Sequence, residues 1–188
     1  IAAVLLARGA RVGECRATHY DELDYVLQSS RDDIFAAKDI LRLLLQEQPI
    51  LISNFLGYML GHFIDLRVDF IDIFIQFGAN ASQADSAGVT LLHACAYYAT
   101  YFTAEFTEEK RYLQCAEFLI LHGADVSAKT IADATNGALA MYDNYPLGGG
   151  MTPLDVAAKC GAEPRREAVT KALQAAILKR DAAAGRTP

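Results

Sequence analysis

The chain has 188 residues, of which 53% are hydrophobic and 21% are charged, and its formal net charge is −6. Disordered tails are poor in apolar residues, so this composition indicates a folded protein. General nucleic-acid binders need a clustered excess of Lys and Arg, which is absent here, and we expect no nucleic-acid partner. The longest apolar stretch, residues 50–64, is shorter than the about 20 residues of a bilayer span, and we expect a buried helix there instead of a membrane span.

The first residues, IAAVLLARGA, resemble the apolar core of a signal peptide, but no basic leader precedes them. They belong instead to a sequence motif that recurs along the chain: an aliphatic pair, two further residues, then Gly-Ala. Copies occupy Leu5–Val12, Phe74–Ala81 and Leu119–Val126, and a degenerate copy occupies Leu43–Ile50. The phrase predicts the end of a helix whose glycine takes the left-handed C-terminal cap. Because the first copy lacks the helix that should precede it, we expect the chain to be part of a longer one.

A second phrase stands before two of the predicted helix pairs, as DSAGVTLLHACA in Asp85–Ala96 and GGGMTPLDVAA in Gly148–Ala158. Thr90 and Thr152 are natural N-caps, and Pro153 fits the first turn of a helix. In these two phrases the sequence resembles the ankyrin-repeat family, whose unit of about 33 residues is a β-turn followed by two antiparallel helices. The resemblance implies an all-α solenoid with β-turn or hairpin fingers, and the fold class predicted here is therefore an ankyrin-type helical stack.

The spacing of the phrases departs from the family's period in two places. Gly78 and Gly123 are 45 residues apart, which is 12 more than a repeat of about 33 residues. Thr90 and Thr152 are 62 residues apart, which leaves 17 more after the same correction. Connections tolerate added length more readily than helices do. We therefore predict two inserts between helices, in residues 100–111 and residues 130–146.

The resulting layout is a single array over residues 1–182 with a tail at residues 183–188. It consists of a partial repeat at 1–12 and repeats at about 13–50, 51–82, 83–129 and 147–182. The predicted helices are near residues 21–29, 33–47, 52–64, 67–77, 91–99, 108–122, 153–160 and 165–180. The last helix lacks the Gly-Ala exit and turns polar, as a terminal capping repeat does.

No catalytic or metal constellation is expected. The glycine run before Thr152 lacks the Lys-Ser/Thr ending of a phosphate-binding loop, and its last residue, Gly150, is interpreted as a turn glycine like Gly88. His93 occupies the histidine position of the family's signature, which the resemblance gives a hydrogen-bonding role, and Cys95 is interpreted as a packing residue. No histidines are spaced i, i+4 and no Cys-x-x-C pair is present, so we expect no metal and no cofactor. The sparse cysteines favour reduced thiols and an intracellular protein, cytoplasmic or nuclear.

The resemblance implies a partner-binding surface made of the turns and the exposed faces of the first helices. The residues that it assigns to this surface are Ser86, Ala87, Val89, Tyr97, Tyr98, Met151 and Lys159. Tyr97 and Tyr98 are either anchors for a partner or a cover for the first insert, since tyrosine is enriched in binding hot spots and also packs well. Tyr142 and Tyr145, in the second insert, are further anchor candidates.

We therefore predict a non-catalytic module that binds a protein partner, of unknown identity, through its concave face and inserted finger. An alternative is a structural or targeting subunit of a larger assembly or enzyme, held through the apolar third repeat at residues 50–77. A repeat scaffold serves many targets, so the sequence does not name the partner.

Overall fold

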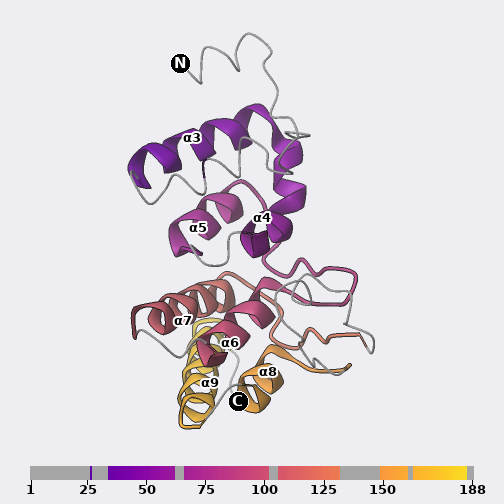
Figure 1. Ribbon diagram of the computed structural model, residues 1–188. Helices are drawn as coiled ribbons and strands as arrows, with labels where there is room; N and C mark the ends of the chain where they lie inside the picture. The colour runs from indigo at the N-terminus through magenta and orange to yellow at the C-terminus, as the bar shows by residue number, and fades with distance from the viewer. Residues whose placement is uncertain are drawn as a thin grey trace. The chain divides into compact units, whose positions relative to one another are not determined.

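The computed structural model describes residue 26 and residues 34–61, 66–101, 106–131, 149–160 and 163–185. The regular elements in these ranges are all helical, and one isolated antiparallel bridge pairs Ala84 with Thr90, so the protein is all-α. The chain divides into two compact units, Ile1–Ala79 and Asn80–Pro188. Figure 1 shows α3, α4 and α5 of the first unit and α6 to α9 of the second. Each unit is described by itself below.

The described part of the first unit begins with α3 (Ile34–Glu47). Its buried residues, Ala37, Leu41, Leu44 and Leu45, recur every three or four positions and so line one face of the helix. The helix ends before Gln48-Pro49, because proline has no N–H to donate and disfavours a helical residue before it. Pro49 instead begins a short 3-10 helix, η1 (Pro49–Asn54), which leads directly into α4 (Phe55–Gly61).

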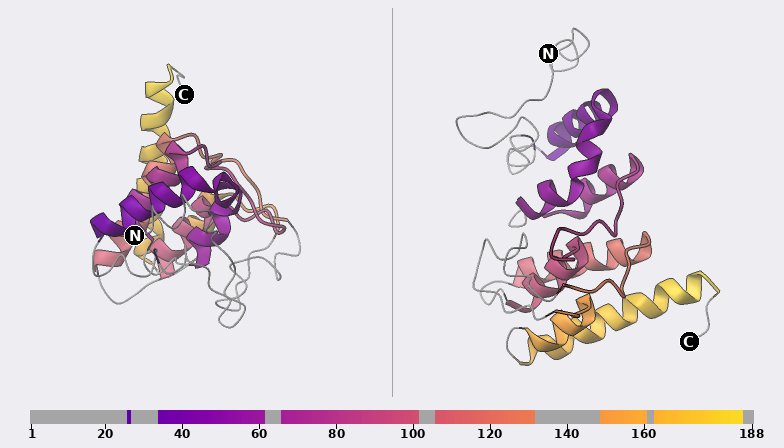
Figure 2. Two further views of the ribbon diagram at one scale, coloured as in Figure 1. Left: turned by 90° about the horizontal axis from the view of Figure 1, so that it is seen from above. Right: turned by 90° about the vertical axis from the view of Figure 1, so that its right-hand side faces the viewer.

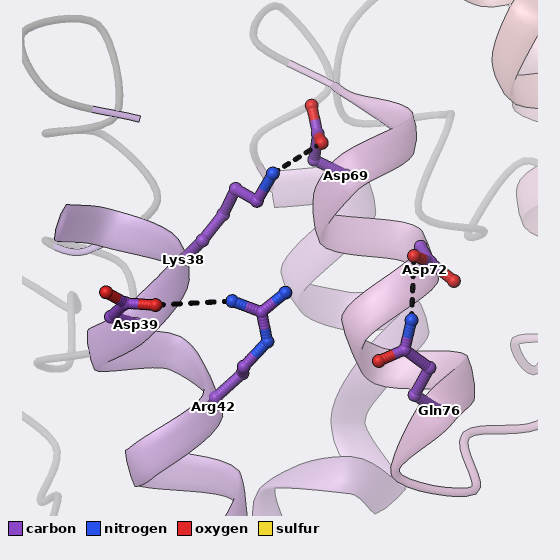
Figure 3. Close-up of polar contacts among 6 residues, drawn as sticks. All are labelled: Lys38, Asp39, Arg42, Asp69, Asp72 and Gln76. Carbon is purple, nitrogen blue, oxygen red and sulfur yellow. Dashed lines mark hydrogen bonds and ion pairs between the residues drawn. The ribbon is translucent and has the colours of Figure 1, made fainter. Parts of the chain in front are cut away.

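α5 (Val68–Gln76) completes this unit and packs against α3. Phe74 on α5 is fully buried, and its ring centroid lies 5.3 Å from that of Phe55 on α4. The Lys38 ammonium on α3 lies 2.7 Å from the Asp69 carboxylate on α5, so an ion pair links these two helices (Figure 3). The unit is thus held by an apolar core with a polar contact at its margin.

The second unit contains α6 (Leu91–Tyr101), α7 (Phe106–Leu121), α8 (Pro153–Lys159) and α9 (Arg165–Ala183). Residues 91–100 of α6 are all buried, because α7, α8 and α9 all pack against this helix. The longer α9 lies beside α8 and also contacts α7 (Figure 2). α6 is therefore the central helix of the unit, and its composition, LLHACAYYATY, is apolar on every side as such a position requires.

Six of the predicted helices agree with the structure to within a few residues at each end, namely those at 33–47, 67–77, 91–99, 108–122, 153–160 and 165–180. The helix predicted at 52–64 begins as the 3-10 helix η1 and continues as α4 to Gly61; residues 62–65 lie outside the described residues. The helix predicted at 21–29 also lies outside them, apart from Val26, which is helical.

Candidate partner-binding surface at the turns

Two helices of the protein, α5 and α7, end in the same backbone motif. Gly78 follows α5 with a φ of 93°, and Gly123 follows α7 with a φ of 89°. The residue after each glycine donates its N–H to a carbonyl five positions back, over 2.9 Å in both cases. This pattern is the Schellman motif, in which a residue with positive φ reverses the chain and satisfies the last carbonyls of the helix. The left-handed glycine predicted from the recurring Gly-Ala phrase is confirmed at both positions.

The hydrogen bonds after each glycine repeat as well. The side chains of Asn80 and Asp125 each accept a hydrogen bond from the backbone N–H two residues later, at 2.9 and 2.8 Å. Both residues therefore form the local turn for which Asn and Asp are favoured. The Ser82 hydroxyl oxygen accepts a hydrogen bond of 2.8 Å from the Asp125 N–H, so the first turn directly contacts the second.

A tight hairpin-like turn at residues 85–89, called the first finger below, follows the first of these turns. The Asp85 carboxylate accepts hydrogen bonds from the N–H groups of Ala87 and Val89, both at 2.8 Å. The Asp85 N–H donates to the Val89 carbonyl over 3.0 Å, and the Gly88 N–H donates to the Asp85 carbonyl over 3.0 Å. Gly88 has a φ of 73°, which closes this tight turn. One carboxylate thus fixes the finger, and its chain leads directly into α6.

A second finger begins at Thr130 and ends at Met151, and the hydrogen bonds that close its base match those of the first finger although the residues differ. Thr130 takes the place of Asp85: its N–H donates to the Met151 carbonyl over 3.0 Å, and its hydroxyl oxygen accepts from the Met151 N–H over 3.0 Å. The Gly150 N–H donates to the Thr130 carbonyl over 2.7 Å, and Gly150 has a φ of 80°. Two residues separate Asp85 from Gly88, whereas nineteen separate Thr130 from Gly150. The additional 17 residues deduced from spacing therefore enter between the two sides of a finger whose base is unchanged, and Thr130 itself belongs to that base.

The two fingers are in direct contact. The Ile131 N–H donates to the Ala87 carbonyl over 2.9 Å. At Gly88 the approach is so close that a Cβ atom would lie 2.6 Å from the Lys129 carbonyl oxygen. Real Cβ atoms do not come that near to a backbone oxygen, so only glycine fits this position without displacing the second finger.

His93, on the first turn of α6, joins the central helix to the second finger. Its Nδ1 accepts a hydrogen bond of 3.1 Å from the Thr90 N–H, so Nδ1 carries no proton. The proton is consequently on Nε2, which donates to the Met151 carbonyl over 3.0 Å. Burial lowers the pKa of His93, although the Met151 carbonyl and the carboxylates of Asp85 and Asp125 oppose this shift. His93 is therefore a neutral residue whose hydrogen bonds join the start of α6, at Thr90, to the second finger, at Met151.

At the start of α8, Thr152 and Asp155 form a reciprocal capping box. The Thr152 N–H donates to the Asp155 carboxylate over 2.9 Å, and the Asp155 N–H donates to the Thr152 hydroxyl oxygen over 3.2 Å. Hydrogen bonds from Thr152, with smaller contributions from the charges of Lys159 and Lys129, lower the pKa of Asp155. Both lysines are exposed, so an accessible cluster of charge lies close to the base of the second finger.

The structure does not present Tyr97 and Tyr98 to a partner. Their exposed fractions are only 6% and 4%, and the Tyr98 ring centroid lies 5.1 Å from that of Tyr97 and 5.6 Å from that of Tyr112 on α7. The expectation that these two side chains form an exposed anchor is corrected accordingly: they pack inside the second unit, because α6 is covered by its neighbours. Three more residues assigned to the binding surface are buried, namely Ala87, Val89 and Met151.

Of the other assigned residues, Ser86 and Lys159 are exposed, and Tyr142 and Tyr145 lie outside the described residues. Sequence reasoning missed Lys129 and Ile131, which are exposed beside the second finger, Ile131 at 59%. Their position where the long insert begins was the signal that could have identified them. The exposed residues of the two fingers include Ser86, Lys129, Ile131 and Gly149.

Cys95, interpreted from the sequence as a packing residue, is fully buried on α6, and burial raises the pKa of its thiol well above the ordinary value. Burial also raises the pKa of Cys115 to about 12. Such thiols stay protonated at neutral pH and are poor nucleophiles. In the described part of the chain, no three His, Cys, Asp or Glu side chains are grouped so that they could hold a metal ion. None of the helices described here is both long and apolar enough to cross a membrane.

The comparisons with known proteins add no relative. No family model matches the chain, and searches of curated proteins and of solved structures give no significant match. The turns and the surface around them therefore have to be interpreted from their own geometry.

Proposed function

We propose that this protein is a non-catalytic protein-interaction module of the ankyrin-repeat type, working inside the cell. The observation that carries the proposal is the repetition of one hydrogen-bonding scheme: helix exit, Asx turn and finger base recur in the same order with the same backbone donors and acceptors. A turn that is repeated and stacked in this way is the defining feature of an array whose units contact only their neighbours. The free thiols of Cys95, Cys115 and Cys160 favour a reducing compartment.

The partner surface in this proposal consists of the fingers and the exposed end of α8. Because α6 is buried throughout residues 91–100, the accessible side chains are those beside the turns. Ser86 and Ile131 lie on the two neighbouring fingers, and Lys129 and Lys159 add positive charge near Asp155. An exposed aliphatic side chain with charged groups around it suits a protein partner, since binding surfaces combine an apolar centre with a polar rim.

A photo-crosslinking experiment tests this surface. A photoreactive phenylalanine analogue replaces Ser86 in one variant, and Gln174, exposed on α9 away from the fingers, in a matched control. In extract of the native host, we expect the first variant to crosslink one discrete protein that the second variant does not crosslink. An Ile131→Asp chain added without the photoreactive group should compete at least about tenfold less well than the unaltered chain. Equal crosslinking from both positions, or none from position 86, would contradict the proposal.

A further inference from the structure

A separate groove lies between α7 and α9, with a cavity volume of about 210 Å³. Apolar side chains form much of its lining: Leu113 on α7 and Ala172, Leu173 and Ala176 on α9. Lys110 and Glu117 also line it, and both lie on α7. Pockets for drug-sized ligands have volumes of about 300–1,000 Å³. The groove is therefore too small for a nucleotide or similar cofactor and suits a single aliphatic side chain.

The two helices that form the groove run in the same direction. Lys110 and Ala172 line it together, and about two turns further along each helix Glu117 and Lys179 form an ion pair of 2.8 Å. That ion pair bridges the helices toward their C-terminal ends. At the other end, the exposed Lys110 forms no ion pair with a carboxylate of any described residue. The groove thus has one end spanned by paired charges and one end with a single available cation.

Most charged side chains around the groove are paired. α9 carries five basic and two acidic residues, and α7 carries two basic and three acidic residues. Four of the five basic residues of α9 form ion pairs with carboxylates, namely Arg166, Lys171, Lys179 and Arg180. Of the two charged residues that line the groove, Glu117 is paired with Lys179, which leaves the Lys110 ammonium as the charge that an acidic segment complements.

We propose that this groove binds an acidic amphipathic helix of a partner protein. One leucine or methionine side chain of that helix enters between α7 and α9, and a carboxylate of the same helix pairs with Lys110. A groove between two helices is a recurrent binding site for the apolar face of a third. This second site depends on α7 and α9 alone, so it does not rest on the repeat assignment or on the fingers.

The probe is a phage-displayed library of amphipathic helical peptides, selected on the full chain. We expect the enriched peptides to carry an aliphatic residue beside Asp or Glu. Ala172→Trp fills the groove and should weaken their binding at least about tenfold, whereas Ala175→Trp, at an exposed position of α9 outside the groove lining, should change it less than about twofold. Circular dichroism shows whether both tryptophan variants keep their helix content.

A charge exchange provides the second measurement and does not depend on filling the groove. Lys110→Glu should weaken an enriched acidic peptide about fivefold or more, and a peptide whose acidic residue is replaced by Lys should recover affinity for that variant. Lys171→Glu, at a lysine paired outside the groove, is the matched control and should give neither effect. No enrichment, enrichment of basic peptides, equal binding to Ala172→Trp and Ala175→Trp, or no recovery in the charge exchange would each overturn the proposal.

Discussion

The contact between the two fingers predicts an unequal effect of the same substitution at two glycines. Gly150 and Gly88 both have positive φ, at 80° and 73°. Gly150→Ala places its Cβ in open space and suffers only the left-handed backbone penalty of about 1–2 kcal/mol. Gly88→Ala has the same penalty and also places its Cβ 2.6 Å from the Lys129 carbonyl oxygen. Relieving that overlap requires a backbone shift, which costs about 1–3 kcal/mol more.

Urea unfolding followed by circular dichroism measures the difference. We expect the free energy of unfolding to fall by about 1–2 kcal/mol in Gly150→Ala and by about 2–5 kcal/mol in Gly88→Ala. Gly123→Ala is a further control, because its φ of 89° and the open space around its Cβ position match those of Gly150. Equal losses in Gly88→Ala and Gly150→Ala would refute the close stacking of the fingers, and with it the interpretation of the turns as neighbouring repeats.

Three further predictions concern single side chains. Because burial lowers the pKa of His93 in the folded state, the unfolded chain takes up a proton first as the pH falls below about 6.5. The free energy of unfolding, measured with urea, should therefore fall between pH 7.5 and pH 5.5, and His93→Gln should reduce this fall. An unchanged pH dependence in that variant would exclude His93 as the cause. Tyr98→Ala should lower the free energy of unfolding by about 3–5 kcal/mol, since the buried ring leaves a cavity; a loss below about 1 kcal/mol would indicate an accessible side chain. Lys38→Ala should lower the free energy of unfolding by less than about 1 kcal/mol, because the Asp69 carboxylate that pairs with Lys38 is half exposed. A larger loss in thermal unfolding would contradict this expectation.

Several features of the fold could be predicted because their cause is local. Glycine is one of the few residues that tolerate the left-handed helix exit, so the recurring Gly-Ala motif predicts the backbone correctly at Gly78 and Gly123. The copy at Leu5–Val12 lies outside the described residues. Thr152 before Pro153 likewise predicts the start of α8, since the cap and the first-turn proline act within four residues. The 17 additional residues of the second insert could also be predicted, because the number of residues between Thr90 and Thr152 exceeds the length of a repeat plus the first insert.

The candidate site was less predictable, because accessibility depends on elements distant in the sequence. Tyr97 and Tyr98 have the residue type of binding anchors, but whether a tyrosine is an anchor or part of the core is decided by what packs on it, and here Tyr112 and the neighbouring helices do so. The groove beside Lys110 was not visible in the sequence either, since its two sides lie on α7 and α9, more than 50 residues apart.

The sequence by itself determined the all-α class, most helix ends and the place where the second insert enters, because caps, turns and apolar periodicity act over a few residues. The first insert, predicted between helices at residues 100–111, was placed wrongly, since residues 100–101 belong to α6 and residues 106–111 to α7. The hydrogen bond from His93 to a neighbouring turn was expected from the resemblance, and the bond to the Met151 carbonyl confirms it. Only the tertiary structure decided that the second finger packs on Gly88 and that residues 91–100 of α6 are buried. The contact between Gly88 and Lys129 joins residues that are 41 positions apart. Long-range packing of this kind leaves no fixed spacing in the chain from which it could be deduced.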